Sequence, residues 1–122
     1  MVEIITKNNE VLGFNYIIYP LASDNYKYGI ACFDYVNRCN TYFLLEDVKS
    51  VKKTVKDLTI YEMQKLNIYM NNNNEIFQFD KAKNISTKLE MTDFIDIKQC
   101  IKDHFKRIEM ILTQTQSDAY ID

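Results

Sequence analysis

The spacing of apolar residues changes along the chain, and this change limits the folds it can adopt. From Tyr26 to Phe33, aromatic and aliphatic residues at every second position give the period of two expected for a strand. From Phe94 to Ile111, apolar residues recur at spacings of three and four, the period of a helix face. Strand-like patterns in the first half and helical patterns in the second half predict an α+β fold.

The first half is expected to supply most of the strands. The predicted strands are Val2–Thr6, Val11–Tyr19, Tyr26–Phe33 and Thr41–Leu45, with a short one at Glu75–Phe79. The connections are short, which favours antiparallel neighbours. We therefore predict an antiparallel β-meander of four to five strands, covered on one face by two to three helices from the second half.

Two helices are predicted before the C-terminal one. Val48, Val51 and Val55 recur at helical spacing, so Glu46–Lys56 is interpreted as an amphipathic helix, although valines are mediocre helix formers and a strand stays open as the alternative. Thr59–Met70 has a better start signal, because Thr59 and Glu62 match a capping box. The run of four asparagines, 71–74, is interpreted as the loop that closes this helix.

The C-terminal helix, predicted over Asp93–Thr113, carries a heptad-like seam. Its members are Phe94, Ile97, Ile101, His104, Ile108 and Ile111, and Phe105 and Leu112 widen it. The seam could face the core of the domain, or it could join two copies as a homodimer or bind another partner. Residues 114–122 are polar and are expected to fray.

Composition narrows the function classes. At 122 residues the chain is expected to form a single domain, 1–122, and its net charge of −2 argues against nucleic-acid binding. Only 2 glycines argue against a phosphate-binding loop. Three cysteines without a signal peptide or an apolar membrane span predict a cytoplasmic protein with reduced thiols and no membrane partner.

One set of residues could hold a metal. Cys32, Cys39, Cys100 and His104 offer three thiolates and an imidazole, a ligand set that suits zinc. Cys100 and His104 are four residues apart on one predicted helix face. Cys32 and Cys39 are seven apart, which is wider than in common zinc knuckles, so three unconnected thiols are the simpler interpretation. We predict no metal, no cofactor and no catalytic group.

Lysines form the one concentrated basic stripe in the sequence. Lys49, Lys52, Lys53 and Lys56 would share a face if their segment were helical. Such a face could contact phosphates, but the stripe contains no arginine and no stacking aromatic residue. A solvated helix face is the simpler interpretation.

Tyrosines are the candidate partner-binding residues. Tyrosine is enriched at protein interfaces, and the chain contains 9 of them. The candidates are Tyr16, Tyr19, Tyr26, Tyr28, Tyr35 and Tyr42. We predict a small non-enzymatic protein-binding module, such as an inhibitor or immunity-type factor, including the accessory proteins of phages and other mobile elements. The alternatives are a ligand-sensing regulatory domain and a zinc-stabilised domain.

Part of the chain resembles a known family. Glu3 to Val51 contains a strand pair ending at Pro20, an aromatic-led strand from Tyr28, and Leu45-Glu46-Asp47-Val48 after it. This order is similar to a WYL domain, a small β-barrel ligand-sensing module of bacterial regulators. Of the Trp-Tyr-Leu signature only Tyr28 matches, and the family's basic binding residues have no clear counterparts. The resemblance implies a barrel with a ligand site.

Overall fold

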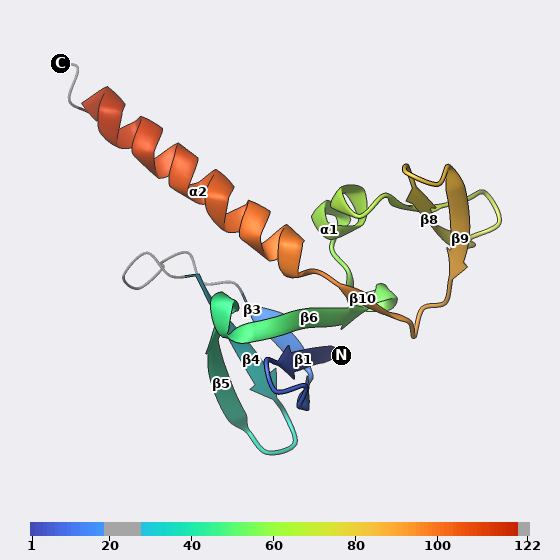
Figure 1. Ribbon diagram of the computed structural model, residues 1–122, viewed down its shortest axis with the longest axis horizontal. Helices are drawn as coiled ribbons and strands as arrows, with labels where there is room; N and C mark the ends of the chain where they lie inside the picture. Colours follow the sequence, from blue (N-terminus) through green and yellow to red (C-terminus); the bar gives the residue numbers. More distant parts are fainter. Residues whose placement is uncertain (19–27, 120–122) are drawn as a thin grey trace.

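The computed structural model describes residues 1–18 and 28–119, without the side chains of 112–119. Within these ranges the chain is mostly β, with ten strands in three antiparallel sheets (Figure 1). The strands are β1 Val2–Thr6, β2 Val11–Phe14, β3 Tyr16–Ile18, β4 Gly29–Asp34, β5 Cys39–Leu44, β6 Val48–Thr54, β7 Ile68–Met70, β8 Ile76–Asp80, β9 Ile85–Leu89 and β10 Phe94–Asp96. The helices are α1 Ile60–Lys65 and α2 Lys98–Ala119, with 3-10 turns at Leu45–Asp47 and Val55–Asp57.

Two of the sheets enclose the larger core. The first has the strand order β10-β6-β1-β2 and the second β3-β4-β5. The chain passes from the first to the second at Asn15, between β2 and β3, and returns through the turn Leu45–Asp47. Both sheets direct apolar side chains inward, where Ile4 and Ile30 are fully buried beside the first turns of α2.

The third sheet, β7-β8-β9, has a smaller core with α1. Val55, Ile68 and Ile76 form its buried centre. Leu58 and Leu66 pack against this cluster and against the larger one, so the two cores are continuous through these leucines. The predicted capping box is confirmed, because Thr59 Oγ1 accepts from Glu62 N–H at 3.1 Å and the Glu62 carboxylate accepts from Thr59 N–H at 2.8 Å.

The prediction of a meander covered on one face by two to three helices is wrong. Its largest error is Glu46–Lys56, which contains the central strand β6 and not a helix. Thr6 pairs with Val48 and Ile5 with Ser50, so the register shifts at Lys49. This bulge places Val48 and Val51 both in the core, and the resulting spacing of three imitates a helix face.

The other two predicted helices are shorter or displaced. The predicted helix Thr59–Met70 ends after Lys65, because Asn67 has a positive φ of 56° and turns the chain into β7. The asparagine run 71–74 therefore closes the β7–β8 hairpin and not a helix. Phe94 lies in β10, and the final helix begins only at Lys98, where Asp96 accepts a hydrogen bond from the Lys98 N–H at 2.9 Å.

Asparagines occupy most of the positive-φ positions of the tight turns, where glycine is often found in other proteins. Asn9, Asn74 and Asn84 each occupy the left-handed region in a hairpin turn, with φ between 53° and 64°. Asparagine tolerates this conformation better than most residues. A chain with only 2 glycines can therefore still make several tight hairpins.

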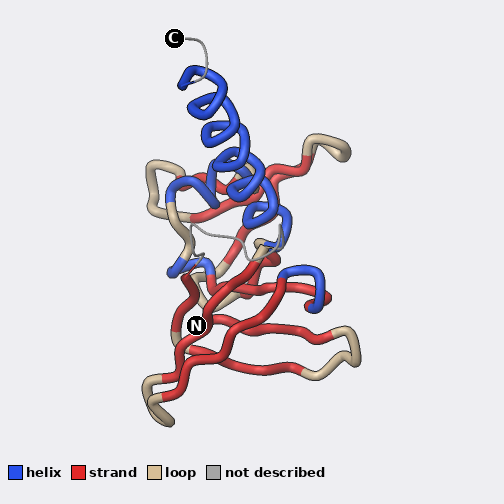
Figure 2. The backbone as a smooth tube through the Cα atoms, turned by 90° about the vertical axis from the view of Figure 1, so that its left-hand side faces the viewer, coloured by secondary structure: helices blue, strands red, loops and turns tan. Residues whose placement is uncertain are grey.

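The first turns of helix α2 pack against the sheets, and the rest of the helix projects away from them (Figures 1 and 2). Ile97, Ile101 and Phe105 are buried in the larger core, whereas Met110 and Ile111 are 71% and 60% exposed. The first part of the predicted seam is thus core. The helical backbone continues to Ala119, within the segment expected to fray. Among the described helices, none combines the length and apolar character that crossing a bilayer requires.

Candidate protein-binding face

The outer side of the β3-β4-β5 sheet is rich in aromatic residues. Ile30 and Cys32 of β4 point into the core, so Ala31 and Phe33, which alternate with them along the strand, point to the opposite side. The strand register adds neighbours from β3 and β5 to this side. We call the resulting surface the aromatic face, and it comprises Tyr16, Ile18, Ala31, Phe33, Tyr35, Tyr42 and Leu44.

One end of the aromatic face is an ordered stack of rings. Tyr16 pairs with Phe33 across the strands, and their rings are stacked at 4.5 Å with an interplanar angle of 5°. The Tyr35 ring lies 5.2 Å from Tyr16. Asn15 fixes the backbone of Tyr35, because its side-chain oxygen accepts the Tyr35 N–H at 2.7 Å. Three rings are therefore held together while Tyr35 stays 66% exposed.

Tyr42 covers the other end of the aromatic face. It is 53% exposed and lies in a row with Ala31 and Ile18, which is 47% exposed. Its ring lies directly over Gly29, where a β-carbon would collide with the phenol end of Tyr42. The missing side chain of Gly29 thus lets the Tyr42 ring lie close to the sheet.

The other tyrosine candidates do not share this surface. Tyr28 stacks on Phe105 of α2 at 4.7 Å and 7°, and its hydroxyl donates to the Glu109 carboxylate. Burial, followed by this acidic neighbour, raises the pKa of Tyr28 above its usual range. Tyr28 is therefore an anchor for α2. Tyr19 and Tyr26 lie outside the described residues.

The residues considered for zinc do not converge. Cys32 and Cys100 are buried in the larger core, whereas Cys39 is exposed at the start of β5. The His104 ring lies against Phe105, 5.7 Å away. Among the described residues, no group of three or more His, Cys, Asp or Glu side chains is arranged to hold a metal ion.

Burial also makes two of the thiols poor nucleophiles. It raises the pKa of Cys32 to about 12. It raises the pKa of Cys100 as well, and the negative charge of Glu62 adds to this effect. Only thiolates attack readily, so these two cysteines are expected to be inert at neutral pH.

The lysine stripe is dispersed by the strand that carries it. Lys53 makes an ion pair of 2.8 Å with the buried Glu62, and Lys49 donates to Asn9 at 2.8 Å. Lys52 is flanked in register by two acidic residues, Glu3 of β1 and Asp96 of β10. Lys56 is exposed in the following turn. The four lysines do not form one basic surface.

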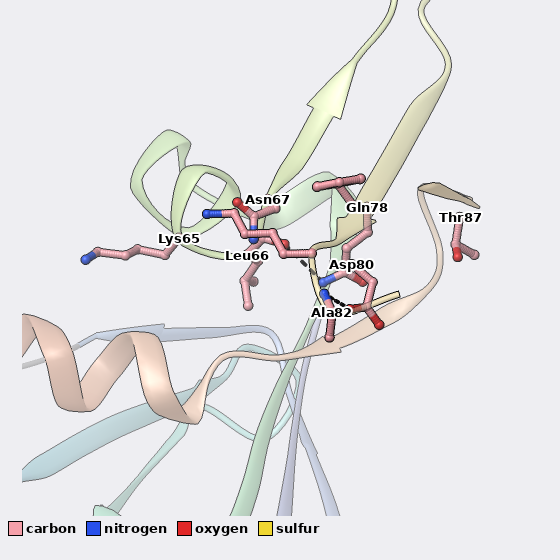
Figure 3. Close-up of a pocket in the computed structure, with 9 residues that line it drawn as sticks. Lys65, Leu66, Asn67, Gln78, Asp80, Ala82 and Thr87 are labelled. Carbon is pink, nitrogen blue, oxygen red and sulfur yellow. Dashed lines mark hydrogen bonds between the residues drawn. The ribbon is translucent and has the colours of Figure 1, made fainter. Parts of the chain in front are cut away.

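A polar groove lies where α1 meets the third sheet (Figure 3). It encloses about 490 Å³. Gln78 lines it and donates to the Leu66 carbonyl at 3.2 Å, and the Asp80 carboxylate accepts from the Ala82 N–H at 3.0 Å. Lys81 gives it a cation, whereas the Lys65 side chain extends away from Gln78 and Asp80 and its ammonium lies 5.8 Å from the centre of the Tyr61 ring. The sequence contained no recognisable signal for this groove.

Comparisons with protein-family models, with curated proteins and with solved structures gave no match for this chain. The resemblance to a WYL domain therefore stays a prediction.

Proposed function

We propose that the protein is a non-enzymatic protein-binding module and that the aromatic face is its binding surface. The observation that supports this most is the exposure of Tyr35, Tyr42 and Ile18 on one side of a single sheet. Contiguous exposed apolar patches mark interaction sites. Aromatic anchors also contribute most of the energy in many interfaces.

The geometry favours tight binding as well as contact. Tyr16 and Phe33 are already stacked, and Asn15 fixes the backbone of Tyr35. Side chains that are ordered before binding lose less entropy when a partner docks. A module of this kind acts by occupying its partner, as inhibitors and immunity-type proteins do.

The test compares a face variant with a matched tyrosine elsewhere. The double variant Tyr35→Ser/Tyr42→Ser removes the two most exposed rings of the face, and the control Tyr69→Ser removes a tyrosine that is 44% exposed on the third sheet. Partners captured from a native lysate by the unmodified protein are purified and titrated against all three proteins. We expect the face variant to bind at least about 30-fold more weakly, since each anchor contributes roughly 1 kcal/mol or more. Equal affinity of the unmodified protein and the face variant would refute the proposed surface.

The groove beside α1 supports a second candidate function, the binding of a small anionic ligand. Lys81 would meet its charge, and Gln78 and Asn67 would supply polar contacts. A thermal-shift screen of nucleotides and organic acids tests this, because a ligand at 100 times its Kd adds about 2.7 kcal/mol. A Lys81→Ala variant must abolish any shift. A shift that persists in the variant places the ligand elsewhere.

A further inference from the structure

The strand β5 has one edge that no described strand covers. It pairs with β4 on one side and is the last strand of its sheet. Its six residues, Cys39–Leu44, include no charge and no proline. Charged residues and prolines usually protect an exposed edge from pairing with another strand, and β5 has neither. β5 is therefore open to strand addition.

The hydrogen bonding next to β5 shows which of its backbone groups face outward. Leu45 N–H donates to the Tyr28 carbonyl at 2.8 Å, so Leu45 directs its backbone groups toward β4. Facing groups alternate along an antiparallel strand, and the β4–β5 register continues without a shift from Leu44 to Cys39. Asn40, Tyr42 and Leu44 therefore present their N–H and C=O groups to the open edge.

We propose that β5 pairs antiparallel with β5 of a second copy of this chain, with the two Tyr42 residues opposite each other. In this register Asn40 of each copy lies opposite Leu44 of the other. All three outward residues then exchange backbone hydrogen bonds, about six in total. The two three-stranded sheets become one continuous sheet of six strands.

Charge at the two ends of β5 favours a second copy in this orientation. Arg38 precedes the strand, and Glu46 and Asp47 follow it. All three are exposed. Pairing centred on Tyr42 brings Arg38 of each copy toward Glu46 of the other, so opposite charges approach twice. The acidic Asp34 nearby is engaged in its own turn, where it accepts from the N–H groups of Val36 and Asn37. A parallel arrangement would bring like charges together.

The pairing also extends the aromatic face. Tyr42 lies on the outer side of the sheet, so the two Tyr42 rings become neighbours on one surface. The dimer would present two aromatic faces side by side, and a partner with two matching sites would gain avidity. Self-pairing uses the backbone of β5 and does not depend on partner binding.

The first test blocks one backbone donor. Asn40→Pro removes an outward N–H without touching the β4–β5 ladder, and Asn40→Thr is the matched control. Sedimentation equilibrium over a concentration series should show a dimer for the unmodified protein and for Asn40→Thr. Asn40→Pro should raise the dimer Kd at least about tenfold, since two hydrogen bonds are lost per dimer. Circular dichroism checks that each variant is folded.

The second test reverses charges and decides the matter if the proline variant does not fold. Glu46→Lys alone should weaken the dimer roughly tenfold, because it places like charges opposite each other twice. Arg38→Glu combined with Glu46→Lys should restore it.

Three results would overturn the inference. The first is a monomer at every concentration, and the second is a dimer that neither Asn40→Pro nor Glu46→Lys affects. The third is a dimer lost in Met110→Lys but kept in Asn40→Pro, which would place the contact on α2. The single variant Tyr35→Ser, unlike the double face variant, leaves β5 unchanged, so its loss of partner binding can be separated from loss of the dimer.

Discussion

The two cores of this protein differ in size and in how they are built. The larger one is enclosed by two sheets and the base of α2, and several of its residues, including Val2, Ile4 and Ile30, are fully buried. The smaller one has Val55, Ile68 and Ile76 at its centre beneath short strands and one short helix. Small cores bury little apolar surface and open more readily. The larger core should therefore set global stability, and the smaller one should be the first part to open.

The largest expected effect comes from a cavity in the larger core. Ile4→Ala should lower the free energy of unfolding by about 4 kcal/mol, because Ile4 is fully buried on β1, an inner strand of the first sheet. Ile76→Ala in the smaller core should cost about 2 kcal/mol, at the low end for such a change. Urea denaturation gives both values. Hydrogen exchange should show local opening of β8 in Ile76→Ala alone, and equal protection losses throughout both variants would remove the distinction between the cores.

The next effect concerns the ion pair between β6, in the larger core, and α1, beside the smaller core. Glu62 of α1 is 1% exposed and pairs with Lys53 of β6, so Glu62→Leu leaves a largely buried ammonium without its partner. The expected cost is about 3 kcal/mol. The double variant Lys53→Met/Glu62→Leu should recover most of it in the same urea titration. A double variant no more stable than Glu62→Leu would show that the capping role of Glu62 dominates.

Many strands of the two sheets around the larger core could be predicted from sequence. In a strand with one exposed side, apolar and polar residues alternate with a period of two. β6 could not be predicted, since its bulge at Lys49 shifts the pattern within the strand. β7 and β10 lie within segments predicted as helices. Each strand has only three residues, which is too short to show an alternating pattern next to Asn67 or Asp96. β9 was missed because most of its side chains are exposed and polar.

The candidate face was only partly predictable for a similar reason. Alternation shows that Ile30 and Phe33 lie on opposite sides of β4, but not which side is inward. Tyrosine content therefore pointed to Tyr16, Tyr35 and Tyr42 and also to Tyr28, which faces α2. Phe33 was overlooked, although its position out of phase with Cys32 carried the signal. The strand pairing decides between the two sides.

A smaller effect tests the start of α1 within the smaller region. Thr59→Ala removes the side-chain acceptor for the Glu62 N–H and should cost about 1 kcal/mol, whereas Thr59→Ser should be close to neutral. If the smaller region opens first, hydrogen exchange of α1 should accelerate more than that of β1. Uniform acceleration in both elements would show a single cooperative unit.

The smallest effect is a pH dependence at the end of β6. The hydrogen bonds from the Met1 ammonium and from Thr54 hold the pKa of Asp57 below its usual value. A lowered folded-state pKa adds stability that is present above the unfolded pKa and is lost as the pH falls through the folded one. Asp57→Asn should therefore lower the Tm slightly in the neutral region and converge with the unmodified protein at low pH, which flattens the acid limb of a plot of Tm against pH. An unchanged acid limb would show that other carboxylates control it.

Because the described contacts of α2 with the rest of the protein lie mainly near its N-terminal end, small movements there are amplified along the helix. Its 22 residues make a rod about 33 Å long, and its described contacts lie mainly near its base, at Tyr28 and among the buried residues before Glu109. A tilt of roughly 10° at that base would sweep the far end through about 6 Å, by simple leverage over this length. A small shift of the Tyr28 ring, or the loss of its contact with Glu109, would therefore produce a much larger displacement at the far end of α2.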